Sequence, residues 1–159
     1  MRIGFASDIH ALVENRKLIL AGVEVPFEKG EKAHSDGDVV YHAIAESILG
    51  ALALGDLGEH FPDNDPQYLN INSAIIVRRV FRLMIKKGYV VNNIDVSISL
   101  EKPKLKNYKE QMRKNIAELL ETDIANVSIK AGTNEQMDAV GQGLAVKAES
   151  IVLLKEVIH

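Results

Sequence analysis

The chain has 159 residues, of which 47% are hydrophobic and 26% charged, the balance of an ordinary globular protein large enough for one hydrophobic core. Its formal net charge of −3 gives no electrostatic reason to expect nucleic acid or an anionic membrane as a partner. Because cysteine is absent, the sequence excludes disulfides and thiolate ligands, so any metal must bind to His, Asp or Glu.

No repeat, low-complexity tract or Pro/Gly/Ser-rich linker interrupts the chain, which predicts a single domain over residues 1–159. The N-terminus lacks the unbroken apolar run of a signal peptide. The longest apolar stretch, residues 44–57, contains Glu46 and Asp56 and is too short to span a bilayer. We therefore expect a cytoplasmic protein that has no membrane partner.

The first part of the chain predicts a strand, a hairpin and a helix in that order. Residues 2–10 are expected to form a short strand that runs into a loop, and residues 17–27 a hairpin with an edge-like second strand. A helix is expected over residues 38–53, with Gly55 as the stop signal beyond its end. Residues 55–67 are rich in Gly, Pro, Asp and Asn, which predicts a loop.

Two more amphipathic helices are predicted further along the chain. One is capped by Asn72 or Ser73 and ended by Gly88. The other covers residues 108–121. Their apolar stripes are Ile75, Ile76, Val80, Leu83 and Met84 in the first, and Met112, Ile116, Leu119 and Leu120 in the second.

Three strands are predicted in the second half of the chain. Residues 89–103 alternate, so that Val96, Ile98 and Leu100 face one way and polar residues the other. Residues 126–131 predict a short strand and residues 144–157 a long last strand, with a loop or turn over residues 132–143 between them. Strands that alternate with helices favour an α+β fold, a mixed β-sheet with helices packed on one face.

The opposite face of that sheet is expected to be polar without being highly charged. It would carry Ser97, Ser99, Ser128, Lys130, and either Lys147 with Glu149 or their small neighbours. Such a face either meets water or meets copies of itself in an oligomer, and the periodicity alone leaves both possibilities open.

One candidate metal site is visible in the residue pattern. Asp8 and His10 lie two residues apart in an extended segment, so their side chains share one face. His42 is the best third ligand, because it lies one turn into the first helix, four residues after Asp38. One Asp and two His leave a position open for substrate or water, as in catalytic zinc sites, and the same trio could hold non-haem iron. A chance pairing without a metal also remains open.

The segment HSDGDVVYH, residues 34–42, leads into that helix. Asp36 and Asp38 lie where caps and first-turn acids are favoured, so capping is their first expected role. His34 and Ser35 lie beside free helix amides, a favourable position for binding an anionic ligand.

Four motifs occur in order and with the spacing of a known family: D-x-H at residues 8–10, H-S-D-G-D-x-x-x-H at 34–42, G-D-[IL]-G-x-H-F-P-D-x-D at 55–65, and T-x-E at 133–135. In these motifs the chain resembles the 2-C-methyl-D-erythritol 2,4-cyclodiphosphate synthase family of the non-mevalonate isoprenoid pathway. The resemblance covers essentially the whole chain, and the motif at 55–65 is its most specific part.

The resemblance implies a lyase that cyclises 4-diphosphocytidyl-2-C-methyl-D-erythritol 2-phosphate to 2-C-methyl-D-erythritol 2,4-cyclodiphosphate and releases CMP. It further implies a homotrimer with its active sites between subunits and its sheets facing the threefold axis. The substrate's own 2-phosphate would attack its β-phosphorus, so no protein nucleophile is required. This fits a chain without cysteine and without an evident Ser–His–Asp arrangement.

The resemblance also implies roles for individual residues. Zn²⁺ would bind Asp8, His10 and His42, and Mg²⁺ or Mn²⁺ would bridge the substrate phosphates. His34 and Thr133 would polarise the phosphates in the transition state. Residues 61–65 would line the pocket, residues 100–106 would receive the cytidine, and residues 132–135 its phosphates. The positions implied to bind substrate are Ser35, Asp56, Gly58, Phe61, Pro62, Asp63, Asp65, Leu100, Lys104, Lys106, Gly132 and Glu135.

The chain departs from the family pattern at three places. Ala6 and Ser7 stand where the family has Gly and an aromatic residue, and Gly132 replaces the first Thr of its T-T-x-E turn. The largest departure lies in residues 138–145, with Ala139 for an aromatic, Gln142 for Arg and Leu144 for Glu. Loss of a phosphate-binding Arg costs about 1.5–3 kcal/mol. Binding of an isoprenoid diphosphate in the central cavity of the trimer is therefore predicted to be weak or absent.

Two rival functions remain at the level of the sequence. The altered segment 138–145 suggests, as one alternative, that the chain is a trimeric ligand-binding homologue with reduced activity. The metal ligands alone would also suit a metal-dependent phosphodiesterase. The set of motif residues that is retained favours the cyclising enzyme over both.

Overall fold

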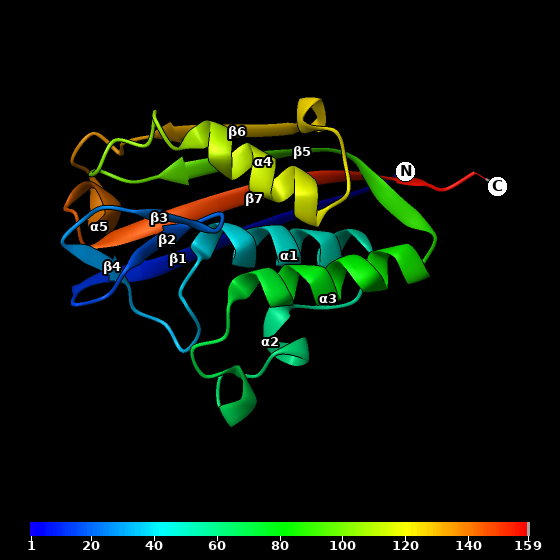
Figure 1. Ribbon diagram of the computed structural model, residues 1–159, viewed down its shortest axis with the longest axis horizontal. Helices are drawn as coiled ribbons and strands as arrows, with labels where there is room; N and C mark the ends of the chain where they lie inside the picture. The colour runs from blue at the N-terminus through cyan, green and yellow to red at the C-terminus, as the bar shows by residue number, and fades with distance from the viewer. Residues whose placement is uncertain (159) are drawn as a thin grey trace.

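The computed structural model describes residues 1–158, and its main sheet has five strands in the order β4-β1-β7-β5-β6 (Figure 1). β5 and β6 run parallel, whereas the other neighbours are antiparallel, so the sheet is mixed as predicted. The strands of this sheet are β1 Arg2–Glu14, β4 Lys29–Glu31, β5 Tyr89–Ser99, β6 Val127–Gly132 and β7 Ala145–Glu156. The predicted hairpin is a separate ribbon of β2 Leu18–Leu20 and β3 Val23–Val25.

Three longer helices lie on one side of the sheet (Figure 1). They are α1 Val39–Ala51, α3 Ser73–Lys86 and α4 Lys109–Leu119. Short helical turns occupy the connections: α2 Leu57–His60, η1 Pro66–Tyr68, η2 Ile124–Asn126 and α5 Asp138–Gly141. The fold is therefore the expected α+β arrangement, with the helices packed on one face.

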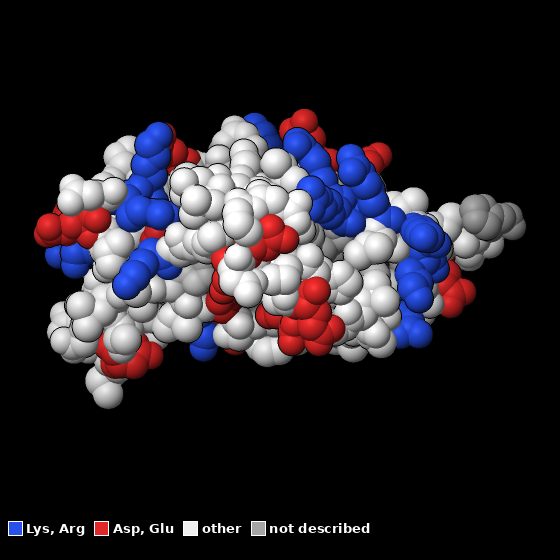
Figure 2. All heavy atoms as spheres, turned by 90° about the horizontal axis from the view of Figure 1, so that it is seen from below, with Lys and Arg blue, Asp and Glu red and all other residues white. Residues whose placement is uncertain are grey.

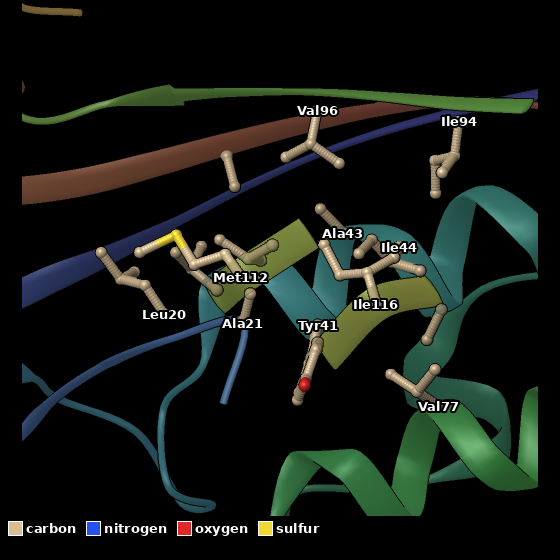
Figure 3. Packing of buried hydrophobic residues seen from close by; sticks show 14 of the residues in the cluster. Leu20, Ala21, Tyr41, Ala43, Ile44, Val77, Ile94, Val96, Met112 and Ile116 are labelled. Carbon is tan, nitrogen blue, oxygen red and sulfur yellow. The ribbon is translucent and has the colours of Figure 1, made fainter. Parts of the chain in front are cut away.

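The hydrophobic core fills the space between this helical layer and the sheet (Figure 3). α1 is buried over most of its surface because it lies between the sheet and α3. Side chains from the sheet, the hairpin and the three helices meet there. Those labelled in Figure 3 are Leu20, Ala21, Tyr41, Ala43, Ile44, Val77, Ile94, Val96, Met112 and Ile116.

Asp38 connects the hairpin to the start of α1. It is the N-cap of α1 and accepts a hydrogen bond from the Tyr41 amide at 3.0 Å. The same carboxylate accepts from the amides of Ala21 at 2.9 Å and Gly22 at 2.7 Å. Burial raises the pKa of Asp38 to about 6, although these amide hydrogen bonds oppose the shift. The capping role predicted for Asp38 is therefore confirmed.

Several local expectations differ from the structure. β1 continues to Glu14, because its pairing with β7 extends from Arg2 to Ala11 and carries the backbone through the predicted loop. β4 was not foreseen, because the sequence KGE has no strand pattern. The predicted loop over residues 55–67 contains α2 and the first part of η1, since Asp56 and Asp65 each cap a helical turn.

The apolar stripe of α3 also differs in one position. Ile75 is 39% exposed, whereas Val77 is buried together with Ile76, Val80 and Met84. The contacts of α3 with α1 decide which residues of this helix are buried. The spacing of apolar residues in the sequence predicted Ile75 in place of Val77. In α4, Met112, Ile116 and the capping residue Leu120 are buried as expected, and Leu119 is partly buried.

The sheet face opposite the helices is not covered by any part of the described chain. Its β5–β7 region is polar as predicted, with ion pairs Lys130–Asp95 at 2.8 Å and Lys147–Glu149 at 3.7 Å. β1 adds an apolar patch to this face, which was not expected. The patch forms because every second residue of the strand points to this face. The exposed apolar residues here are Ile3 at 70%, Phe5 at 57%, Ile9 at 52% and, on β7, Ile151 at 46%.

On the helix-covered side, Lys and Arg side chains gather in a band toward the right of the view, whereas Asp and Glu side chains gather near its centre (Figure 2). Among residues 1–158, no helix is both long and apolar enough to cross a membrane.

Candidate active site and metal centre

Asp8, His10 and His42 converge as the sequence predicted. The Asp8 Oδ2 atom lies 3.0 Å from His10 Nε2 and 3.5 Å from His42 Nδ1. One ligand atom from each of the three residues lies within 4.8 Å of the others, and the two imidazole rings are 5.2 Å apart in an edge-on arrangement. β1 supplies the first two side chains, and the first turn of α1 supplies the third. This is the only group of its kind in the described part of the chain.

The orientation of His10 suits metal binding. Its Nδ1–H donates to the Gly37 carbonyl at 2.7 Å, so in the neutral ring Nε2 carries the lone pair that can bind a metal. In the protonated ring the same nitrogen, 3.0 Å from Asp8 Oδ2, donates to that carboxylate. Metal-binding histidines have a partner of this kind on the nitrogen that does not bind the metal. The donor set and its arrangement therefore fit a divalent cation with open coordination positions.

The electrostatics of the three side chains are strongly coupled. Burial alone would raise the pKa of Asp8, but the hydrogen bonds from His10 and His42 hold it well below its usual range. Burial likewise opposes the charged form of His10, yet the hydrogen bond and negative charge of Asp8 raise the pKa of this imidazole. The Asp8 carboxylate is therefore ionised and available as a ligand near neutral pH.

These ligands open into a cleft of about 350 Å³. Part of its wall comes from the segment before α1 and part from α2 and the loop that follows it. The predicted site residues that line the cleft are Asp8, His10, His34, Ser35, His42, Gly58, Phe61 and Asp63. A cleft of this size with a few converging polar groups is typical of a small-molecule site.

His34 and Ser35 are held by the surrounding loops. The Nε2 atom of His34 lies 3.3 Å from the Asp65 carbonyl oxygen. Ser35 is buried, and its Oγ accepts from the Gly37 amide at 3.1 Å. Asp65 itself is partly exposed and caps η1, and hydrogen bonds from Gln67 lower the pKa of its carboxyl. Asp65 therefore orders this loop, and only its backbone carbonyl reaches His34.

Asp56 is the N-cap of α2 and accepts from the Glu59 amide at 3.1 Å. The cleft of this single chain is not lined by Asp56, Pro62 or Asp65. The loop is tied to α1 by Glu46, which accepts from the Leu57 amide at 3.1 Å.

A second hollow, of about 220 Å³, lies at the C-terminal ends of β5 and β6. The predicted cytidine and phosphate residues that line it are Leu100, Lys104, Lys106, Gly132 and Thr133. Glu135 lies nearby in sequence, and its amide donates to Thr133 Oγ1 at 3.3 Å. Three lysines, including Lys109, give this hollow a positive character.

The cleft and the hollow share no lining residue. The structure therefore divides the predicted site residues between two separate depressions of one chain. His34 belongs to the cleft and Thr133 to the hollow, so the two predicted catalytic residues are not brought together within this chain.

The three substituted positions within residues 138–145 are all exposed. Ala139 lies in α5, Gln142 donates to the Gln136 carbonyl at 3.0 Å, and Leu144 is 57% exposed. The predicted weak binding of an isoprenoid diphosphate stays a prediction.

The sequence interpretation missed several residues that shape the cleft. Glu46 lines it one helical turn beyond His42, a spacing of four that was available as a signal. Lys32 supplies a positive charge from the other side. Tyr68 packs edge-on against Phe61 at 5.5 Å, and Arg79 lies over both rings at 5.7 and 5.8 Å. No local sequence pattern predicts this stack, because its three residues come from separate segments of the chain.

Comparison with known proteins agrees with this geometry. The model of the YgbB family matches residues 1–155. A 2-C-methyl-D-erythritol 2,4-cyclodiphosphate synthase from Brachyspira hyodysenteriae is 54% identical over 156 residues, 98% of this chain and 99% of the relative. The synthase from Carboxydothermus hydrogenoformans is 49% identical over 159 residues, 100% of this chain and 98% of that relative.

Solved structures show the same fold. The bifunctional IspDF of Campylobacter jejuni superimposes with a TM-score of 0.94 at 38% identity, over 98% of this chain and 42% of that longer protein. IspF of Plasmodium falciparum in a CDP complex gives a TM-score of 0.87 at 35% identity, over 99% of this chain and 97% of that one. With this agreement over the full length of the curated relatives, the chain belongs to the YgbB family, the family of the 2-C-methyl-D-erythritol 2,4-cyclodiphosphate synthases.

Proposed function

We propose that the chain is a lyase of isoprenoid precursor biosynthesis. It cyclises 4-diphosphocytidyl-2-C-methyl-D-erythritol 2-phosphate to 2-C-methyl-D-erythritol 2,4-cyclodiphosphate and releases CMP. The observation that carries this proposal is the convergence of Asp8, His10 and His42 in a cleft that also contains His34 and Asp63. The full-length identity to named synthases supports the same reaction.

In this reaction an oxygen of the 2-phosphate forms a bond to the β-phosphorus, and the bond from that phosphorus to the oxygen of CMP breaks. Both partners are parts of one substrate, so catalysis consists of positioning and charge stabilisation. His34 and Thr133 polarise the phosphates. The residues of the cleft hold the erythritol end, and the hollow around Lys104 and Lys106 receives the cytidine diphosphate end.

Asp8, His10 and His42 would hold Zn²⁺, and the hydrogen bond from His10 Nδ1 to Gly37, which leaves Nε2 as the ligand atom of the neutral ring, supports this assignment. Zinc held by these residues, together with a second divalent ion such as Mg²⁺ or Mn²⁺, would supply positive charge that offsets the charge developing in the transition state. Ser35, Asp56, Gly58 and the loop from Phe61 to Asp65 then orient the substrate in the cleft.

The active form would be a homotrimer whose sheets face the threefold axis. Two observations support this arrangement. The uncovered sheet face carries Ile3, Phe5 and Ile9, and each chain alone keeps the cleft and the hollow apart. A neighbouring subunit would complete the site by bringing its Thr133 hollow to the cleft of the first. The rest of the interpretation, a single cytoplasmic domain over residues 1–159, stays a prediction.

The direct test is to incubate the full chain with the diphosphocytidyl substrate, Zn²⁺ and Mg²⁺, and to follow the products by phosphorus NMR. We expect CMP and a ring-closed diphosphate in equal amounts. Asp8→Ala and His42→Ala should each lower the rate at least about 100-fold, because each removes a metal ligand. The exposed Lys86→Ala on α3 is the matched control and should leave the rate unchanged.

The products separate the rival functions. Hydrolysed, open-chain phosphate in place of the ring would identify a phosphodiesterase. Substrate binding with no CMP would identify a ligand-binding homologue. CMP formation that survives both Asp8→Ala and His42→Ala would contradict the proposed role of the metal site.

A further inference from the structure

The nitrogen of His42 that faces away from Asp8 lies close to α3. His42 Nε2 is 2.9 Å from the Oγ of Ser73, the first residue of that helix. Ser73 is fully buried, and its hydroxyl donates a short hydrogen bond to Oδ1 of Asp36. The Ser73 amide donates to Oδ2 of the same carboxylate at 3.0 Å. A continuous chain of contacts therefore runs from Asp36 through Ser73 to His42.

The direction of these hydrogen bonds is fixed by the number of protons. The Asp36 carboxylate can only accept, and it also accepts from the Asp38 amide at 3.1 Å. The single hydroxyl proton of Ser73 is therefore directed at Asp36. The Ser73 oxygen is left to accept from His42, which places the imidazole proton on Nε2 and the lone pair on Nδ1.

The same nitrogen has a second, longer contact that does not determine the tautomer. Ser35 Oγ lies 3.2 Å from His42 Nε2 and accepts from the Gly37 amide. The hydroxyl proton of Ser35 has no assigned acceptor, so this serine could donate or accept. Only the Ser73 hydroxyl has its proton direction fixed by a carboxylate acceptor.

We propose that Asp36 and Ser73 are positioning residues that fix the tautomer and ring orientation of His42, so that Nδ1 faces the cation held by Asp8 and His10. The inference deepens, and rests on, the proposed metal binding. It also corrects the expected role of Asp36. This residue binds the first amide of α3 and does not cap α1, where Asp38 is the N-cap. The start of α3 thereby becomes part of the metal centre.

Two variants and one matched control test the proposal. Ser73→Ala removes the acceptor of the His42 proton. Asp36→Asn places an amide NH₂ where one carboxylate oxygen now accepts, which opposes a hydroxyl or amide donor with another donor. Asn72→Ala is the control, since Asn72 caps α3 through the Ala74 amide at 2.9 Å and does not touch His42. It removes the cap of the same helix end without breaking the chain of contacts.

The measurement is the affinity of the full-length protein for Zn²⁺, by competition with a chromophoric chelator, with the fold checked by circular dichroism. We expect Ser73→Ala and Asp36→Asn to bind Zn²⁺ about 10–100-fold more weakly than the parent. Asn72→Ala should stay within threefold. In the zinc-loaded parent and in Asn72→Ala, the protected Nε2–H of His42 should give an imidazole resonance in proton–nitrogen NMR spectra, which Ser73→Ala should lose.

Different failures have different meanings. Parent-like affinity in folded Ser73→Ala and Asp36→Asn would overturn the positioning role and leave the proposed metal site intact. Equal weakening in Asn72→Ala would overturn it too, because general loosening of α3 would then explain the loss. A parent protein that binds no Zn²⁺ at micromolar concentration would overturn the proposed metal site, and the positioning role with it.

Discussion

Glu31 is a buried carboxyl whose pKa is set by its surroundings. It lies in β4 with no exposed surface, and its Oε2 accepts from the Ile19 amide at 3.1 Å. Its other oxygen is buried without a hydrogen-bond partner among the described residues. Burial, reinforced by the negative charge of Asp38, raises the pKa of Glu31 to about 9. This carboxyl is therefore protonated in the folded protein at neutral pH and ionised in the unfolded chain.

We predict that Glu31→Gln removes a pH-dependent loss of stability. Above the unfolded pKa near 4.5, the folded parent retains a proton that the unfolded chain releases, so this group's contribution to the free energy of unfolding falls as pH rises toward 9. The slope is at most about 1.4 kcal/mol per pH unit. Urea unfolding in the presence of a chelator should give similar values for parent and variant near pH 4.5, and a more stable variant at pH 8.

The exposed Glu24→Gln in β3 is the control and should follow the parent at every pH. A constant difference between parent and Glu31→Gln across the whole pH range would contradict the raised pKa of Glu31.

At the scale of elements, the position of the site depends on how closely α1 approaches β1. Gly4 of β1 lies against α1, where an added Cβ would be 1.9 Å from the Ser47 carbonyl oxygen and 2.7 Å from the Ala51 amide nitrogen. The hydroxyls of Ser47 and Ser150, 2.9 Å apart, connect the same helix to β7. Since β1 carries Asp8 and His10 and α1 carries His42, this contact also sets the spacing of the three candidate metal ligands.

We predict that Gly4→Ala lowers the free energy of unfolding by about 3 kcal/mol or more, because the helix must move to make room for the methyl group. Its Zn²⁺ affinity should fall as well, since His42 moves with the helix. Gly50→Ala is the control: its Cβ would meet only the Phe5 carbonyl oxygen at 3.9 Å, and alanine favours the helix by about 0.5–1 kcal/mol. Denaturant unfolding checks both values, and a Gly4→Ala protein as stable as the parent would contradict the close contact.

At the scale of the whole molecule, the uncovered sheet face and the two separate depressions both support the proposed homotrimer. Ile3, Phe5 and Ile9 form an apolar row on the face that no helix covers. Thr133 lies in a different depression from His34. A second copy of the chain on this face would both bury the row and bring the two sets of residues together.

We predict that Phe5→Glu dissociates the proposed homotrimer, because three carboxylates would be forced close together in an apolar contact. Sedimentation should give three times the 17.5 kDa chain mass for the parent and a single chain for the variant. Ile85→Glu, on the helix α3 at 45% exposure, should remain a trimer. A parent that sediments as a monomer would contradict the proposed assembly, and activity of the monomeric variant would contradict a site shared between subunits.

Much of the local structure followed from short-range rules. The spacing of two residues put Asp8 and His10 on one strand face, and Asp38 marked the start of α1 because a carboxylate satisfies free helix amides. The expectation that β1 would give way to a loop was wrong, because its pairing with β7, more than 100 residues away, extends the strand. The roles of Asp36 and Glu46 were also missed, since their partners come from other segments.

By itself the sequence determined the family, the fold class, the order of the main helices and long strands, and the three candidate metal ligands, because these depend on motifs, periodicity and caps within a few residues. Only the tertiary structure decided which distant groups meet. It joined Asp36 to Ser73 across 37 residues, buried Glu31 without a charge partner, and divided the predicted site between two depressions. Such contacts arise from the packing of the helical layer on the sheet, and no local pattern records them.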